Sequence, residues 1–521
     1  MKDITMTTQN YTYETVKGSH PAYGRNINRY RFYNDSYLGG DDYSNGNYLP
    51  HFVYEDGNDY AKRIESTPLA NHARNIIQIY TSFLFSKEPR RDYAGIDIDP
   101  SLDSFLMDAD LEGRDFNAFM RDASVLASIY GQSLVLVDRP STQANTLEDE
   151  LTAGIRPYVS VVSAENIIDW HFERQNNGKY ELVMLKILEE GTKDSTTFRY
   201  YYPSHIDIVT IYEHKKQVKI SQRHENPLGY IPAVWLYNER SADRGIGISD
   251  LTDIADLQKS IYSDYSELDS TLKLSNHPSL VMTRTGVDAN AGPGSVILMD
   301  ETIPDQLRPY LLQPSSASID SILNSISTKV EEIDRIAHLG GVRSTSTRSV
   351  SGVSLIVERQ LLHARLQEKA NNLALAEEQI WGIWADWQNL RWEGQVDYPH
   401  GYNIRDTHAE LQNLKIAREL QPDNAILQRE IDRKIAELVI SDPDRLESVI
   451  TDMDRPRDPD GALKGKMGDS DMEHPKLTVD TWKAHIQGMI DEGYTLAEIE
   501  VLHPEVTQLM LETNGIQGPS N

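Results

Sequence analysis

The sequence contains no cysteine, and this absence excludes several kinds of site. Without cysteine there is no disulfide, no zinc–thiolate site and no cysteine nucleophile. Long apolar runs are also missing, since no stretch approaches the roughly 18 consecutive apolar residues of a transmembrane helix. The N-terminal residues 1–15 are polar and lack the apolar core of a signal peptide. We therefore expect a protein of a soluble compartment that makes no membrane contact.

Catalytic and nucleotide-binding motifs are absent as well. The chain has no G-x-x-x-x-G-K-[ST] loop, no G-x-G-x-x-G after a strand, no H-E-x-x-H and no G-x-S-x-G. The 15 histidines are scattered without a ligand cluster. Among 80 acidic residues some pair always resembles an acid/base couple, so Asp99, Asp103, Asp108 and Asp110 are most simply a solvated surface. We expect no enzyme, no cofactor and no metal site.

The charge balance limits the possible partners. The chain has 521 residues, enough for two to four domains, and a formal net charge of −29. Such a charge argues against a protein that coats nucleic acid, because phosphates are repelled. It leaves room for a small basic contact surface. The 27 tyrosines against 9 phenylalanines suit half-buried surfaces, including contacts between subunits.

The first half of the chain predicts an α+β domain. Residues 1–60 are rich in Tyr, Asn, Asp and Gly, which predicts an irregular arm. Residues 61–248 begin with helices, expected at 68–85 and 115–129, and Gly131 is expected to end the second helix in a left-handed conformation. A buried strand at 133–138 follows. The pattern then predicts an antiparallel meander with short strands at 158–162, 180–188, 196–202, 206–212 and 217–221.

Two helical patterns each carry one narrow apolar seam. The first helix is expected at 249–275, with Ser249 as its N-cap, and the second at 315–338. In both helices the apolar residues follow the spacing 3, 4, 4, 3, 4. They are Ile254, Leu257, Ile261, Tyr265, Leu268 and Leu272 in the first helix, and Ile319, Ile322, Ile326, Val330, Ile333 and Ala337 in the second. A seam of this kind usually packs within its own domain. Here the other faces are polar, and the insert at 276–314 is too small to fold alone. We therefore expect the seams to pack against neighbouring copies of the chain.

The insert between the two seam helices predicts a small β element. Residues 279–283 and 295–299 are expected to be strands, with a turn at Gly292, Pro293 and Gly294 between them. Three prolines, at positions 304, 309 and 314, predict a mostly extended return to the second helix.

The segment at 339–352 is cationic, although the chain is anionic. From Arg335 to Arg365 there are five arginines against one acidic residue, Glu358. Loops of Gly, Ser and Thr are usually plain linkers. With glycines at both ends and hydroxyl side chains between, however, such a loop could contact phosphates without reading bases. The contact residues would be Arg343, Ser344, Thr345, Ser346, Thr347 and Arg348, and the hinges Gly340, Gly341 and Gly352.

The order of these parts resembles that of the portal proteins of tailed bacteriophages. Local phrases are similar too: Gly131–Asp138, Leu228–Pro232 and the opening of the long helix at Gly352–Leu355. The resemblance implies a portal fold with an α/β wing, a two-helix stem, a small β-containing clip, a long kinked helix and an α-helical crown. The implied parts are a wing at 61–248, stem helices at 249–275 and 315–338, a clip at 276–314, a tunnel loop at 339–352, a long helix at 353–393, a crown at 394–452 and a helical tail at 453–521.

The resemblance also implies a function and its partners. Portal proteins form a ring of twelve copies at one capsid vertex, through which double-stranded DNA is packaged and ejected. The implied partners are the terminase large subunit, the head–tail connector, and the major capsid and scaffolding proteins. The implied location is the virion, with the host cytoplasm during assembly. The implied docking residues in the clip are Arg284, Gly292, Pro293, Gly294 and Arg308.

Two alternatives stay open at this point. The first is a metal-dependent nucleic-acid enzyme, for example a nuclease that binds magnesium through dispersed Asp and Glu residues. The second is a minor capsid or adaptor protein without a DNA channel. The mass in solution separates them, because an enzyme is expected as a monomer or dimer and a portal protein as a large closed ring.

Overall fold

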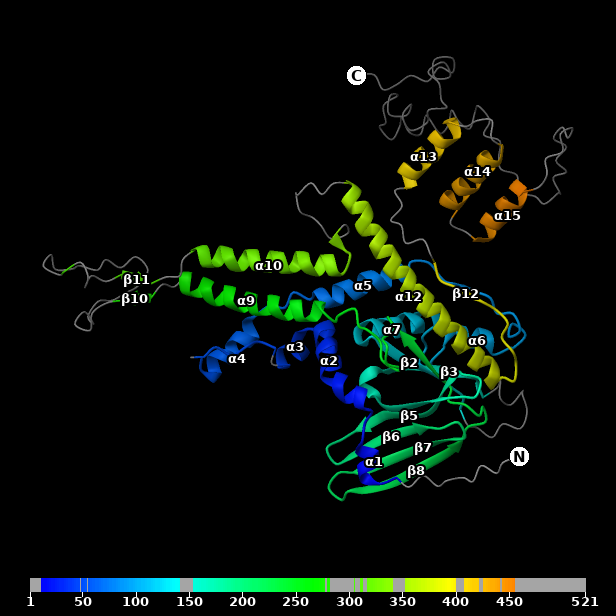
Figure 1. Cartoon of the computed structure of the whole chain (residues 1–521), viewed down its shortest axis with the longest axis horizontal. Helices are drawn as coiled ribbons and strands as arrows, with labels where there is room; N and C mark the ends of the chain where they lie inside the picture. Colours follow the sequence, from blue (N-terminus) through cyan, green and yellow to red (C-terminus); the bar gives the residue numbers. More distant parts are fainter. Residues whose placement is uncertain are drawn as a thin grey trace, which may run out of the picture. The chain divides into compact units, whose positions relative to one another are not determined.

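The computed structural model describes the residues 11–46, 48–53, 55–140, 153–276, 279–281, 304, 310–312, 316–340, 352–399, 407–420, 425–440 and 443–454. The chain divides into two compact units, Met1–Ile404 and Arg405–Asn521. The first unit combines helices with antiparallel sheets, so the fold is α+β with more than one unit, as predicted (Figure 1). No helix within the described ranges is both long and apolar enough to cross a membrane.

The N-terminal region is helical. It contains α1 (Tyr13–Lys17), α2 (Pro21–Leu38), α3 (Gly40–Asn45) and α4 (Gly57–Ser66). Pro21 is the first residue of α2, and the Asp56 carboxylate caps α4 by accepting the N–H groups of Asn58 and Asp59. The prediction of an irregular arm over 1–60 is therefore wrong for the described residues from Tyr11 onward. Tyr30 and Tyr33 share one face of α2, and their burial in the main core supplies the stability that the Asn-rich sequence lacks.

A three-stranded antiparallel sheet with the order β3-β2-β9 forms the centre of the first unit. Its strands are β2 (Gln132–Asp138), β3 (Tyr158–Ser163) and β9 (Ala233–Tyr237), and the helices beside it are α5 (His72–Leu84), α6 (Leu102–Met107) and α7 (Phe116–Tyr130). Asp115 caps α7, and Gly131 ends it with φ +94°, as predicted. A Cβ on Gly131 would lie 2.5 Å from the carbonyl oxygen of Gly247, so this crossing requires glycine.

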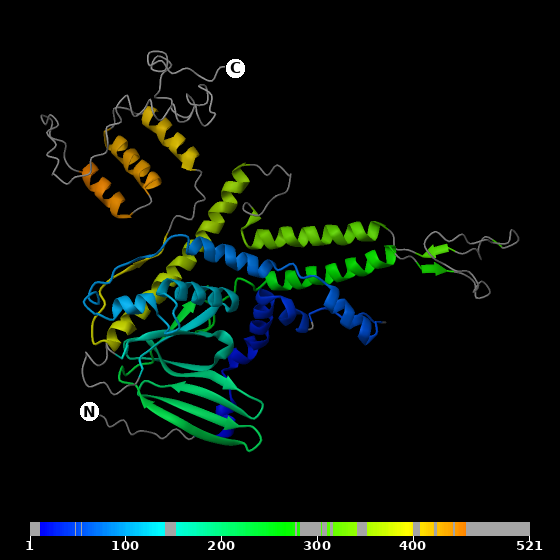
Figure 2. The same cartoon turned by 180° about the vertical axis from the view of Figure 1, so that it is seen from behind.

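Four of the five predicted meander strands lie in a five-stranded antiparallel sheet with the order β4-β5-β6-β7-β8, whereas the strand predicted at 158–162 is β3 and pairs with β2 in the other sheet. The short 3-10 turn η1 (Ala164–Asn166) leads into the five-stranded sheet, whose strands are β4 (Ile167–Arg174), β5 (Tyr180–Gly191), β6 (Ser195–Tyr201), β7 (His205–Tyr212) and β8 (Gln217–Glu225). The sequence analysis did not identify β4, although Trp170 and Phe172 alternate with Asp169, His171 and Glu173 as in a half-buried strand. Figures 1 and 2 show the five-stranded sheet on the side of the three-stranded sheet that faces away from α6 and α7.

Two long helices form a hairpin that extends from the first unit (Figure 2). They are α9 (Ile254–Asn276) and α10 (Ser316–Ile336), and at the far end β10 (Ser279–Val281) pairs antiparallel with β11 (Tyr310–Leu312). The helix α9 begins five residues later than predicted because Ser249 is not its N-cap. The Ser249 hydroxyl is buried, donates to the carbonyl of Ile129 and accepts the N–H of Leu251. The strand predicted at 295–299 lies outside the described residues.

The long helix α12 (Gly352–Trp387) packs on the three-stranded sheet and on α5. Trp381 and Trp384 on its last turns are fully buried beside Phe105. The helix was predicted to reach residue 393 but ends at Trp387, because Asn389 takes a left-handed conformation with φ +54°. Beyond it, β12 (Val396–Asp397) pairs antiparallel with β1 (Arg90–Arg91) in a separate two-stranded sheet.

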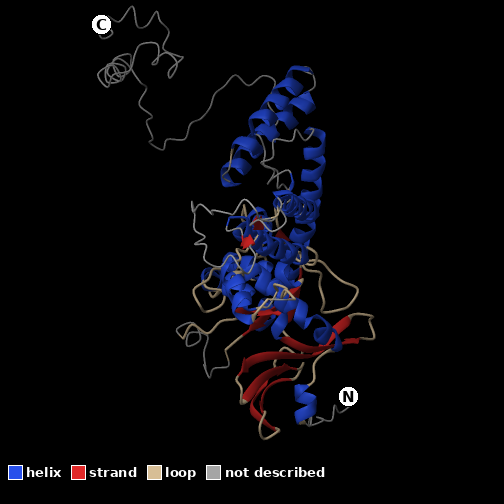
Figure 3. Cartoon of the chain, turned by 90° about the vertical axis from the view of Figure 1, so that its left-hand side faces the viewer, coloured by secondary structure: helices blue, strands red, loops and turns tan. Residues whose placement is uncertain are grey.

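The second unit is helical in its described part. It contains α13 (Thr407–Leu420), α14 (Ala425–Val439) and α15 (Pro443–Asp454), which pack in sequence order (Figure 1). Figure 3 shows the described helices of the chain in blue and its strands in red. The sequence predicts amphipathic helices at 408–420 and 425–440, which match α13 and α14, and α15 was not recognised as a separate helix. The boundary between the units lies after Ile404, whereas the predicted crown began at 394, because β12 ties the intervening residues to the first unit. The helices predicted in the tail beyond 454 lie outside the described residues.

Candidate functional site

The two apolar seams of the helical hairpin pack against each other within one chain. Six seam residues are buried in the main core: Ile254, Ile261, Leu268, Ile326, Ile333 and Ala337. Others pack against the same core: Leu257, Tyr265, Leu272, Ile319, Ile322 and Val330. The prediction that the seams face neighbouring copies is wrong for the buried residues. A side chain that is covered within its own chain has no surface left for another copy.

A polar cross-link fixes the register of the hairpin. The Asp264 carboxylate on α9 accepts hydrogen bonds from Lys329 Nζ at 2.6 Å and from the Ser325 hydroxyl at 3.0 Å, both on α10. The lysine–aspartate pair is mostly shielded from water, so salt screens it less than an exposed pair. The α9 helix has 23 residues, which at about 1.5 Å per residue places the far end of the hairpin about 35 Å from its base.

The N-terminal helices hold one side of α9. Arg63 on α4 is buried and donates two 2.6 Å hydrogen bonds to Glu55 and one of 2.9 Å to the hydroxyl of Ser266 on α9. Tyr43 on α3 meets Tyr262 on α9 edge to face, with ring centroids 5.3 Å apart. The opposite side of the hairpin is different, since the outer face of α10 stays exposed through Ser318, Ser321, Leu323, Asn324 and Thr328.

The two ends of the predicted clip lie side by side at the far end of the hairpin. There β10, which follows α9 in the sequence, pairs with β11, which precedes α10. The predicted docking residues Arg284, Gly292, Pro293, Gly294 and Arg308 lie outside the described residues, and their roles stay predictions.

At its other end, α10 terminates in a well-anchored turn. Ala337 and Leu339 are fully buried, and His338 between them has φ +55°. The Tyr80 hydroxyl on α5 donates a 2.6 Å hydrogen bond to the Ala337 carbonyl. A Cβ on Gly340 would lie 2.9 Å from a carboxylate oxygen of Glu358 on α12, so a side chain there would displace that carboxylate. The left-handed residue of this turn is His338 and not the predicted hinge glycine.

The predicted loop itself begins directly after this turn. Gly341 and the proposed contact residues Arg343, Ser344, Thr345, Ser346, Thr347 and Arg348 lie outside the described residues, and Gly352 is the first residue of α12. Two of the five arginines counted around the loop are paired, Arg335 with Glu332 and Arg365 with Asp250. The local excess of positive charge is therefore smaller than the sequence count implies.

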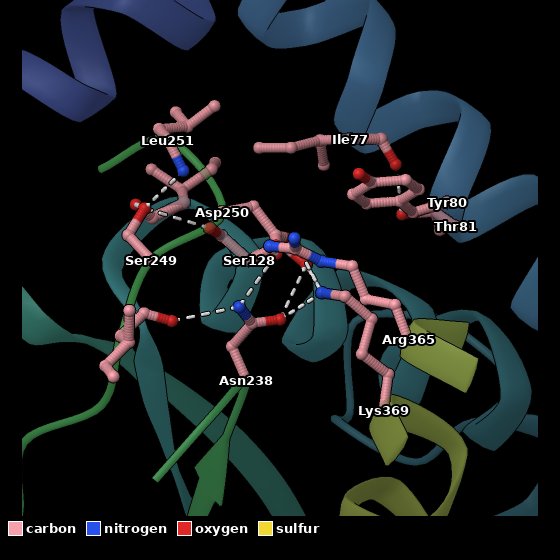
Figure 4. Close-up of polar contacts among 12 residues, drawn as sticks. Ile77, Tyr80, Thr81, Ser128, Asn238, Ser249, Asp250, Leu251, Arg365 and Lys369 are labelled. Atoms are coloured by element: carbon pink, nitrogen blue, oxygen red, sulfur yellow. Dashed lines mark hydrogen bonds and ion pairs between the residues drawn. The ribbon is translucent and has the colours of Figure 1, made fainter. Parts of the chain in front are cut away.

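A buried polar junction joins the base of the hairpin to α12 (Figure 4). Asp250 accepts hydrogen bonds from Lys369 at 2.6 Å, Arg365 at 2.9 Å and the Asn238 amide at 3.0 Å. Lys369 also donates to the Asn238 amide oxygen and to the Ser128 hydroxyl. Ser128 lies on α7, Asn238 follows β9, Asp250 precedes α9, and both cations lie on α12. Four separate segments are thus fastened at one point.

The charge balance of the junction keeps Asp250 ionised. Complete burial by itself raises the pKa of Asp250, but the charges of Lys369 and Arg365 together outweigh it, so the pKa lies below its ordinary value. The Arg365 guanidinium also lies 5.7 Å from the centre of the Tyr80 ring. Tyr80 thereby links the junction to the Ala337 turn, which directly precedes the predicted loop.

The polar groups of the junction serve a structural role. Both carboxylate oxygens of Asp250 are bonded to protein groups, so the junction is suited to hold segments together and not to bind a reacting molecule. In the described part of the chain, no three His, Asp or Glu residues are placed to hold a metal ion together. A pocket of about 550 Å³ lies where the two sheets meet, lined among others by Asp138, Arg199 and Trp387.

Sequence reasoning missed the junction, although one pattern pointed to it. Lys369 stands beside Ala370 within the apolar stripe of the long helix, between Leu366 and Leu373. A lysine on an apolar face that is four residues from an arginine indicates a buried anion elsewhere in the chain. The partner Asp250 could not be identified among 80 acidic residues.

Comparisons with known proteins complete this description. No protein-family model and no curated protein matches the chain. Among solved structures, a chain from the virion of a native gene transfer agent particle is similar with a TM-score of 0.39 and 9% identity, covering 76% of this chain and 95% of that chain. A chain from the neck of an empty gene transfer agent particle is similar with a TM-score of 0.40 and 10% identity, covering 80% and 99%.

Proposed function

We propose that this chain is a subunit of a portal ring, the channel at one capsid vertex through which double-stranded DNA of a tailed-phage-type particle is packaged and ejected. The observation that carries this proposal is the helical hairpin of α9 and α10. At one end it continues into a small β pair, and at the other it leads through the cationic segment into the long helix α12. This is the order of parts in the portal proteins that the sequence resembles.

The charge of the chain fits a channel wall that DNA passes without being held. Each copy has a formal net charge of −29, so a ring of twelve copies would repel the duplex from most of its surface. Arg343 and Arg348 of each copy would supply a limited number of phosphate contacts that do not depend on sequence. Contact of this strength allows movement, because strong binding would stop the DNA.

The anchored turn at Ala337 gives the loop a fixed starting point. Tyr80 holds the turn from α5, and the junction at Asp250 holds α12 on the other side of the loop. We propose that this arrangement keeps the base of every loop at one radius in the ring, so that the loops of all copies reach the same duplex.

The clip would dock the other components of the packaging system. The α9 helix is about 35 Å long at about 1.5 Å per residue, so a clip at the far end of the hairpin would lie where a terminase large subunit or a head–tail connector could reach it. Deletion of residues 286–294 is expected to leave the oligomer intact and to abolish capture of the terminase large subunit. Unchanged capture would move the docking site to another surface.

DNA binding by the assembled ring tests the proposed channel. Arg343→Ser combined with Arg348→Ser should leave assembly intact and weaken binding of a duplex by about tenfold or more at low salt, with a flatter dependence on salt concentration. The matched control changes the exposed Arg174 and Arg240 to serine and should bind DNA like the parent. A loop variant that binds and packages DNA like the parent would refute the proposed role of the loop.

A further inference from the structure

Residues 97–112, the acidic segment, expose apolar side chains among carboxylates. The segment has six acidic residues and no Lys or Arg. The side chains of Ile98 and Met107 are 76% exposed, and that of Leu111 is 45% exposed. Asp97, Asp99 and Asp103 form no ion pair within the part of the chain that the structure describes. Exposed apolar side chains with a rim of one charge are typical of a protein contact surface.

The structure holds Leu111 outward in a left-handed conformation. Its φ is +65°, which is unfavourable for a bulky residue. The turn is enforced by its neighbours: Asp110 accepts the N–H of Glu112 at 2.9 Å, and Asp108 accepts the N–H of Gly113 at 2.7 Å. A conformation of this kind persists only where the surroundings over-determine it, and it is often found at functional surfaces.

Residues 212–220, the basic hairpin, have the complementary character. They carry three lysines, Lys215, Lys216 and Lys219, and one acidic residue. None of the three lysines forms an ion pair with another described residue, whereas Glu213 is paired with Lys17. Tyr212 pairs with Gln217 and Thr210 with Lys219, so Tyr212 and Lys219 share one face of the hairpin. Tyr212 and Ile220 are both exposed.

The basic hairpin includes the free edge of a sheet. The strand β8 is last in the order β4-β5-β6-β7-β8, and only Val218 of its nine residues is not exposed. Lysines on an edge strand often serve only to prevent aggregation. Here the lysines lie beside exposed apolar side chains, and another surface of the same chain has the opposite charge and a similar apolar content.

The two surfaces lie on different sides of the first unit. In Figures 1 and 2, α6, which belongs to the acidic segment, lies on one side of the three-stranded sheet, and β7 and β8 lie on the other. Two surfaces of opposite charge on different sides of one subunit suit a head-to-tail contact. In such a contact, one surface of each copy meets the other surface of the next copy. Such contacts close into a ring when the rotation between copies is suitable.

We propose that the acidic segment of one copy docks on the basic hairpin of the next copy in the ring. This inference rests on the proposed ring and names its contact in the first unit. Carboxylates of the acidic segment face Lys215, Lys216 and Lys219, and Ile98, Met107 and Leu111 cover the exposed ring of Tyr212, which shares a face with Lys219. The charges select the correct pairing of surfaces, and the apolar side chains add area.

Charge exchange tests this contact. Replacing the three lysines of the basic hairpin by Glu, or Asp97, Asp99 and Asp103 by Lys, should each lower the yield of rings by about tenfold or more at low salt, and combining both sets in one chain should restore it to within about threefold. Yield is measured by mass photometry. The control Lys179→Glu removes an exposed lysine outside both surfaces and should assemble like the parent.

Crosslinking gives an independent readout because the natural chain has no cysteine. A chain with Asp103→Cys and Lys219→Cys should form a ladder of covalent oligomers under a short bismaleimide, whereas each single variant stays monomeric on a denaturing gel. Rings that survive both charge reversals and give no ladder would overturn this contact and leave the ring proposal standing. A parent that stays monomeric at high concentration would overturn both.

Discussion

The hydroxyl of Tyr80 donates a 2.6 Å hydrogen bond to the main-chain carbonyl of Ala337, 257 residues away in the sequence. The bond is fully buried and joins α5 to the turn that follows α10. It fixes the position at which the chain leaves the helical hairpin for the cationic loop. The same tyrosine ring lies against Arg365 of the buried junction, so the start of the loop and the α12 helix beyond it share one support.

Tyr80→Phe removes this bond and leaves the Ala337 carbonyl buried without its donor. An unsatisfied buried acceptor costs about 1–3 kcal/mol, so the free energy of unfolding of the first unit should fall by that amount in urea denaturation. The control Tyr180→Phe removes a hydroxyl at an exposed position and should change stability by less than about 0.5 kcal/mol. Equal stabilities for the two variants would show that the bond does not hold the turn.

Asp250→Asn removes the single carboxylate of the junction and leaves Lys369 and Arg365 without an anion. Breaking a buried pair in this way should cost about 3–5 kcal/mol in denaturant unfolding. The exposed Asp243, which pairs with Arg25, provides the matched control, and Asp243→Asn should cost less than about 1 kcal/mol. Adding Lys369→Met to Asp250→Asn should recover part of the loss, because one buried cation is removed. A loss below about 1 kcal/mol for Asp250→Asn would contradict this account of the junction.

Ile326→Asp should unfold the helical hairpin, because it places an ion in the packed seam between α9 and α10 at a cost of several kcal/mol. Ile261→Asp on the facing helix should behave in the same way. Leu323→Asp on the exposed face of α10 is the matched control and should leave the hairpin folded. Amide hydrogen exchange of α9 and α10 measures this. Normal protection in Ile326→Asp would mean that the seam is not packed as described.

Lys186 predicts an unusual dependence of stability on pH. Its ammonium is buried, donates to the carbonyl oxygens of Val16 and Gly18 and lies 4.3 Å from the centre of the Phe198 ring. Burial lowers its pKa to about 8, against the opposing charge of Asp169. Because the unfolded chain, with a lysine pKa of 10.5, binds this proton more strongly, the contribution of Lys186 to stability rises with pH from about 8 to 10.5 and is lost as pH falls through 8.

The measurement compares the parent with Lys186→Met at several pH values. The difference in unfolding free energy, parent minus variant, should grow between pH 8 and 9.5. The series stops at pH 9.5 because the neighbouring Tyr200 would add a second pH dependence above it. Burial raises the pKa of Tyr200 in the folded chain, whereas in the unfolded chain its hydroxyl begins to ionise near the ordinary pKa of 10. A difference that is flat or falls over this range would show that Lys186 is not buried as a cation.

Periodicity predicted most of the fold, and its failures have physical causes. The seams at Ile261 and Ile326 repeat without interruption, so both hairpin helices were predicted to within a few residues at each end. The same pattern led to the wrong packing partner, since the seams were expected to face neighbouring copies and instead pack against each other. An apolar stripe does not show which surface covers it. The helix α2 was missed because Asn and Tyr have low helix propensity, and its stability comes from packing of Tyr30 and Tyr33.

The candidate site was less accessible to sequence reasoning. The cationic character around Arg343 and Arg348 follows from composition, and the glycines mark the ends of the loop. The supports of the loop depend on contacts between distant residues, such as Tyr80 with Ala337 and Lys369 with Asp250, which no local pattern contains. The acidic segment was interpreted as a solvated surface because exposure of Ile98 and Met107 is visible only in the folded chain.

Electron microscopy of the purified full chain, together with measurement of its oligomer mass, tests the portal proposal most directly. The account predicts closed rings with a central hole in negative-stain electron micrographs, and a particle mass close to twelve times the 59.1 kDa of one chain in native mass spectrometry. Monomers or dimers at every concentration, with no ring in the images, would contradict it.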